Sequence, residues 1–63
     1  MCLSTVYLRG QGEETLVARD VSSLSVGQGQ VTCTDILGGQ VTVPGQVQEV
    51  DLMNNLIWLE GGK

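Results

Sequence analysis

The sequence contains no histidine, the side chain that most often acts as a general acid or base. Serine–histidine and cysteine–histidine catalysis are therefore excluded. Imidazole is also the commonest metal ligand in proteins, so any metal site must use other donors. A chain of 63 residues whose core is filled by side chains leaves little space for a substrate pocket. We therefore expect a protein that is not an enzyme.

Basic residues are few and scattered along the sequence. Arg9, Arg19 and Lys63 are outnumbered by seven acidic residues, and the net charge is −4. A protein that binds nucleic acid through its phosphates needs several clustered cations, because binding depends on counterion release. Nucleic acid is therefore a disfavoured partner.

Long apolar runs are also absent. The longest, residues 56–59, is far shorter than the roughly 20 residues that a membrane-spanning helix requires. The first residues do not resemble a secretory signal, and two cysteines are too few for a disulfide scaffold. These absences predict a soluble cytoplasmic protein that does not contact a membrane.

Short runs of strand-forming residues make up most of the chain, and glycine or asparagine pairs separate them. This pattern predicts an all-β fold, a small barrel of about six to seven short strands. Residues 1–60 would form one domain, and 61–63 a frayed tail. The predicted strands are 2–9, 15–18, 21–26, 30–36, 40–43, 47–52 and 56–60.

Two positions inside these strands carry specific expectations. Pro44 lacks an N–H group for a strand ladder, so Pro44-Gly45 predicts a corner or a bulge. Cys33 alternates in phase with Val31 and is assigned to the core, where free cysteines are usually found.

The first and last predicted strands are apolar on both faces, which a barrel with a single interior does not require. The second face must be covered either by a second subunit or by a long turn of the same chain. We predict a homodimer whose interface involves Leu3, Tyr7 or Trp58, because aromatic residues often anchor such contacts.

Cys2 lies one residue from the chain's first amino group. The Met1 amine, the Cys2 amide and the Cys2 thiolate can chelate one metal ion in a plane, the geometry that Ni(II) and Cu(II) prefer. If Met1 is removed, the Cys2 amine and thiolate form a pair, and two pairs across a dimer axis would complete a square. The simpler interpretation is that Cys2 is a small apolar residue that begins a strand.

Two pairs of acidic residues are weaker candidates for a cation site. Glu13 and Glu14 follow a glycine turn and are predicted to form a solvated hairpin tip. Glu49 and Asp51 share one face of a predicted strand. Neither pair has the ligand spacing of a calcium-binding loop.

Three segments, in this order and in a chain of this length, resemble the CooT family of small proteins associated with the maturation of nickel-containing carbon monoxide dehydrogenase. The segments are 1–8 (Met-Cys-Leu-Ser-Thr-Val-Tyr-Leu), 50–52 (Val-Asp-Leu) and 55–60 (Asn-Leu-Ile-Trp-Leu-Glu). The resemblance implies a dimeric SH3-like barrel that binds Ni(II) at Cys2. It also implies a recipient metalloenzyme, or that enzyme's maturation factors, as partners.

Two function hypotheses follow from the sequence. The first is a nickel-binding accessory protein or metallochaperone that delivers Ni(II) to a metalloenzyme of the carbon monoxide dehydrogenase type. Nickel rather than copper is implied by the resemblance alone, since Cu(II) binds nitrogen and sulfur donors more tightly. The second is a β-barrel interaction module that binds a protein or an RNA at an exposed strand edge.

Overall fold

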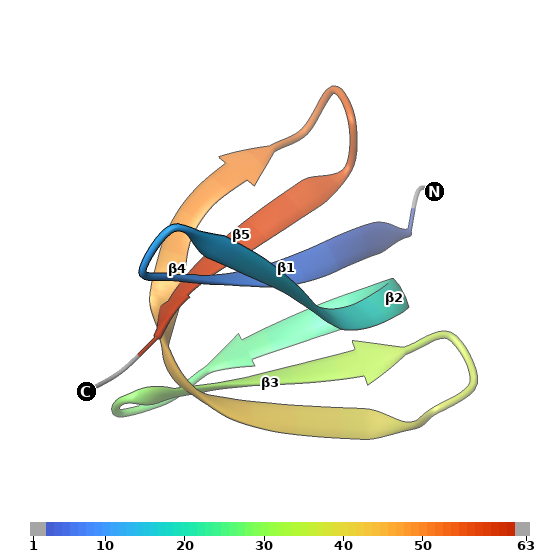
Figure 1. Cartoon of the computed structure of the whole chain (residues 1–63). Coiled ribbons are helices and arrows are strands. Elements are labelled where there is room, and N and C mark those ends of the chain that lie inside the picture. Colours follow the sequence, from blue (N-terminus) through green and yellow to red (C-terminus); the bar gives the residue numbers. More distant parts are fainter. Residues whose placement is uncertain (1–2, 62–63) are drawn as a thin grey trace.

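The computed structural model describes residues 3–61, which form five strands and no helix (Figure 1). The sheet closes into a barrel, since each strand pairs with the next and β5 returns to β1. The β1–β5 pair is parallel and the other four pairs are antiparallel. The all-β prediction is confirmed. The strands are β1 (Ser4–Gly10), β2 (Glu13–Val26), β3 (Gln30–Asp35), β4 (Gln40–Asp51) and β5 (Leu56–Gly61).

The prediction of six to seven short strands is wrong, because two of the expected breaks are bends within longer strands. β4 pairs with β3 through Pro44 and with β5 from Gly45 onward. At this corner Gly45 has a φ of 131°, and its N–H donates to the Gly29 carbonyl at 2.9 Å. The predicted corner at Pro44-Gly45 is therefore confirmed, but the chain turns there without leaving the sheet.

β2 changes partners in the same way. Its first half pairs with β1, and its second half, from Val21, pairs with β3. Asp20, with a φ of 53°, precedes the change, and its carbonyl accepts a hydrogen bond from the Ile36 N–H at 2.9 Å. Two long bent strands thus belong to both halves of the barrel, and this arrangement lets five strands close a sheet.

The interior of the barrel is small and apolar. Its buried side chains are Val6, Val21, Val31, Cys33 and Leu59. Partly buried hydrophobic residues such as Leu8 and Ile57 pack against them. The predicted core position of Cys33 is confirmed. Gly61, which the sequence assigned to the tail, is the last residue of β5 and pairs with Gly45.

The barrel has two ends that carry different turns. Ser4 and Thr5, at the start of β1, lie level with the turn between β3 and β4 and the turn between β4 and β5. We call this the chain-start end. The β1–β2 turn and the β2–β3 turn lie at the opposite end (Figure 1).

Candidate functional site

The two predicted nickel ligands, Met1 and Cys2, lie outside the described residues. The first described residue, Leu3, is half-buried and leads directly into β1. The Thr5 N–H donates to the Asn55 carbonyl at 3.0 Å, and Thr5 pairs with Leu56 of β5. The strand that follows the predicted ligands is therefore anchored in the sheet from Ser4 onward.

Cys33 is 1% exposed and lies among core side chains of β3 and its neighbours. Burial raises the pKa of its thiol, because a thiolate loses its hydration in an apolar interior. The thiolate is the form that binds metals, so Cys33 is a poor metal ligand and an inert core residue.

Residues 3–61 contain no group of three or more cysteine, aspartate or glutamate side chains that could hold a metal ion. The Glu49 and Asp51 pair noted in the sequence is divided between two structural roles. Glu49 binds Arg9 at 3.0 Å, whereas Asp51 accepts hydrogen bonds from Met53 and Asn54 in the following turn. Hydrogen bonds from Asn54 lower the pKa of the Asp51 carboxyl.

Tyr7 and Trp58, two of the three predicted interface residues, lie side by side on the outside of the barrel. They are register partners in the parallel β1–β5 pair, and both are half-buried. Leu16, 43% exposed, pairs with Tyr7 from the other side. Leu3, the third predicted residue, precedes β1 at the chain-start end. The structure thus brings together an aromatic pair that the sequence placed in two distant strands.

Arg9 covers the ring of Trp58, with its guanidinium carbon 4.5 Å from the ring centroid. Its Nε donates to Glu14 at 3.2 Å, and its Nη1 donates to Gln48 at 2.9 Å and to Glu49 at 3.0 Å. A guanidinium can make such contacts from several N–H groups at once. Arg9 is therefore held by its own chain rather than presented to a phosphate.

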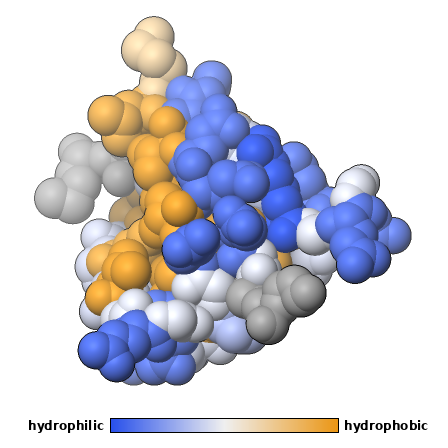
Figure 2. Space-filling model, turned by 90° about the vertical axis from the view of Figure 1, so that its left-hand side faces the viewer, coloured by the Kyte–Doolittle hydropathy of each residue, from blue (hydrophilic) through white to orange (hydrophobic). Residues whose placement is uncertain are grey.

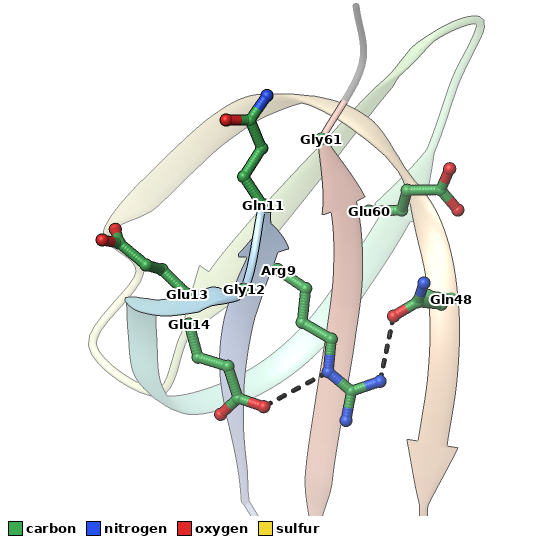
Figure 3. A pocket seen from close by; sticks show the side chains of 9 residues that line it. Arg9, Gln11, Gly12, Glu13, Glu14, Gln48, Glu60 and Gly61 are labelled. Carbon is green, nitrogen blue, oxygen red and sulfur yellow. Dashed lines mark hydrogen bonds and ion pairs between the residues drawn. The ribbon is translucent and has the colours of Figure 1, made fainter.

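A hollow of about 630 Å³ opens beside Arg9, on the side of the β1–β2 turn (Figure 3). The sequence did not predict it, because its wall combines that turn with residues of β4 and β5 from the other end of the chain. It lies at the end of β1 opposite to the chain-start end. Its lining residues are Arg9, Gly10, Gln11, Gly12, Glu13, Glu14, Gln48, Glu60 and Gly61.

Glu13 and Glu14, predicted to form a solvated hairpin tip, lie beside this hollow. Both residues are exposed at the start of β2, as expected for a hairpin tip. Glu14, however, is paired with Arg9, and both acids line the hollow. The carboxylates there are spread around an arginine, and no group of them could hold a metal ion within residues 3–61.

Comparison with known proteins defines first the fold and then the family. A crystal structure assigned provisionally to CooT from Carboxydothermus hydrogenoformans superposes with a TM-score of 0.88, over 98% of this chain and 100% of that one. The two sequences are 18% identical, so this likeness shows the fold alone. The class is that of small all-β proteins built on this closed sheet.

The family is shown by a second comparison. The family model for CooT, a CO dehydrogenase accessory protein, matches residues 1–60, and the chain belongs to this family. No curated protein matches the sequence significantly. Residues 3–61 include no helix long and apolar enough to cross a membrane.

Proposed function

We propose that this protein binds Ni(II) and delivers it during the maturation of carbon monoxide dehydrogenase. Membership of the CooT family makes it an accessory protein of that enzyme. A nickel-containing enzyme needs a supply of its metal, and an accessory protein can provide that supply by binding the ion reversibly.

The burial of Cys33 is the observation that carries the metal proposal. The sequence has two cysteines and no histidine, and Cys33 is closed inside the barrel. Residues 3–61 offer no alternative group of metal-binding side chains. A site with nitrogen and sulfur donors therefore depends on Cys2, through its thiolate, its amide and the Met1 amine or its own amine.

Proton release gives this site a pH dependence. The thiol, the amine and any amide ligand must lose protons before they bind the metal, so affinity for Ni(II) rises with pH. Because Cu(II) binds such donors more tightly than Ni(II), selectivity for nickel depends on which metal is available to the protein.

Titration of Ni(II) at neutral pH into three versions of the protein tests the proposal. Wild type and Cys33→Ser are expected to develop a thiolate-to-metal charge-transfer absorption, and Cys2→Ser is not. Native mass spectrometry of the same samples gives the number of bound ions and shows whether Met1 is retained. Equal binding by wild type and Cys2→Ser would refute the site.

We also propose that the protein acts as a homodimer through its aromatic face, defined as Leu3, Tyr7, Leu16 and Trp58. Half-buried aromatic side chains beside an exposed leucine are typical of interface anchors. RNA binding, the alternative, gains no support from the charges, since Arg9 is already paired with two glutamates.

A further inference from the structure

The turns that follow β3 and β4 share one sequence pattern. Each begins with an aspartate, continues with two large apolar residues and then reaches a glycine or an asparagine. Tight turns normally carry polar or small residues, because they lie in water. Here the four apolar side chains are exposed to 58–93%. The turn sequences are Asp35-Ile36-Leu37-Gly38 and Asp51-Leu52-Met53-Asn54.

The aspartates hold the two turns in the same way. Asp35 Oδ1 accepts hydrogen bonds from the N–H groups of Leu37 and Gly39, both at 2.9 Å. Asp51 Oδ1 accepts from the N–H groups of Met53 at 3.0 Å and Asn54 at 3.1 Å. Leu37 and Met53, 93% and 91% exposed, are therefore presented by fixed turns, which lowers the entropy cost of binding through them.

Both turns lie at the chain-start end. Asp51, before the β4–β5 turn, pairs with Leu56, and Leu56 pairs with Thr5 of β1. Asp35, before the β3–β4 turn, pairs with Val21, and Val21 pairs with Ser4 of β1. In Figure 1 the start of β1 lies between the β4–β5 turn above it and the β3–β4 turn below it. The two apolar turns therefore flank the strand that Met1 and Cys2 precede.

The apolar surface is unevenly distributed over the molecule. Figure 2 looks onto the end of the barrel opposite the chain-start end, where hydrophilic surface covers one side and hydrophobic surface the other. The described turns at the opposite end of the barrel have one large exposed hydrophobic residue beside them, Val26, the last residue of β2. Its exposed fraction is 59%. The three most exposed large hydrophobic side chains of residues 3–61, Leu37, Leu52 and Met53, all lie in the two turns, and exposed apolar surface of this kind marks interaction sites.

We propose that the apolar turns, Ile36-Leu37 and Leu52-Met53, dock a partner protein whose surface has an apolar cleft with a basic rim. The charged residues at the chain-start end favour a partner protein of this kind. Within residues 3–61, three acidic residues, Asp20, Asp35 and Asp51, lie at this end of the barrel with one basic residue, Arg19, so the described surface around the turns is acidic. A second copy packed turn against turn would bring the same acids face to face, and an anionic membrane would be repelled as well.

The apolar turns flank the start of β1, the strand that Cys2 precedes in the sequence, so a partner docked on them would lie beside the start of that strand. This part of the inference rests on the proposed function and identifies the partner as the recipient of nickel. Docking itself needs only the turns, so it can be measured in the absence of metal.

Binding of metal-free protein to nickel-deficient carbon monoxide dehydrogenase, measured by biolayer interferometry, tests the docking surface. The double variant Leu37→Ser/Met53→Ser is expected to bind about tenfold more weakly or worse, as loss of central apolar anchors usually does. Val26→Ser is the matched control, since it removes an exposed apolar side chain from the opposite end, and it should bind like wild type. Asp20→Asn should slow association at low salt, because it removes a steering charge.

Three results would overturn the docking surface. These are no binding by wild type, equal binding by the double variant and wild type, or conversion of a dimer into a monomer by the double variant in light scattering, which would make the turns a contact between copies. Nickel titration of the double variant separates the two proposals. A normal charge-transfer band with lost docking supports both, whereas failure of wild type to bind nickel refutes the metal site and leaves the docking result standing.

Discussion

At the residue scale, burial separates two cysteines that are chemically identical in the unfolded chain. Cys33 faces the core beside Val31 and Leu59, so its sulfur acts as a small apolar group. The sequence predicted this, because Cys33 alternates with polar threonines along its strand. The contacts of Arg9 were beyond sequence reasoning, since they join residues 39 and 40 positions apart.

Replacement of Cys33 by serine should lower the free energy of unfolding by about 1–3 kcal/mol, because a hydroxyl without a partner would be buried in an apolar core. Urea unfolding at neutral pH measures this loss, and Cys2→Ser is the control that should leave stability unchanged. An unchanged unfolding midpoint for Cys33→Ser would contradict the core role of this residue.

The same thiol gives wild type a pH dependence. Burial raises its pKa above the ordinary value of 9.0, so the unfolded chain releases this proton first as pH rises. The stability contributed by the buried thiol is therefore complete below pH 9.0 and is lost progressively above it. Cys33→Ser should show a smaller decline over that range.

At the scale of the elements, two bent strands replace the four short ones that the sequence predicted. The sequence predicted breaks at residues 19–20 and at Pro44-Gly45, where the bends lie, but sequence patterns do not distinguish a bend within a strand from a break between strands. The distinction depends on the partners. At both bends the strand leaves one neighbour and pairs at once with another, so its backbone groups stay hydrogen-bonded.

Gly45→Ala tests the bend of β4. Gly45 is buried and has a φ of 131°, a conformation that an alanine adopts only with strain. We expect a loss of about 1–3 kcal/mol in the free energy of unfolding, measured by thermal or urea unfolding. Gly10→Ala is the matched control: Gly10 is exposed, and an added Cβ there would meet nothing within 4 Å. Equal stability of the two variants would show that the bend tolerates a side chain.

At the scale of the whole molecule, the core is thin, as expected for a chain this short, and much apolar surface remains outside it. The aromatic face and the apolar turns are two parts of that surface, and both include residues at the chain-start end, where Leu3 precedes β1. We propose the first as the contact with a second copy and the second as the docking surface for a different partner, because Arg9 on the aromatic face is already paired whereas acidic residues surround the turns.

Light scattering at micromolar concentration tests the homodimer. Wild type should have the mass of two chains, and Tyr7→Lys should shift it toward one, because a charge would replace an aromatic anchor in the contact. Val26→Ser, remote from the aromatic face, should keep the dimer. A monomeric wild type would refute the assignment and leave the aromatic face covered only by its own chain.

The sequence by itself determined the all-β class, the core position of Cys33, the corner at Pro44-Gly45 and the family. These depend on residue type and on alternation along one strand, which are local properties. Only the tertiary structure decided the number of strands, the pairing of Tyr7 with Trp58 and the grouping of two apolar turns around the start of β1. Those features arise from strand register and from closure of the sheet, which bring together residues that no short-range pattern connects.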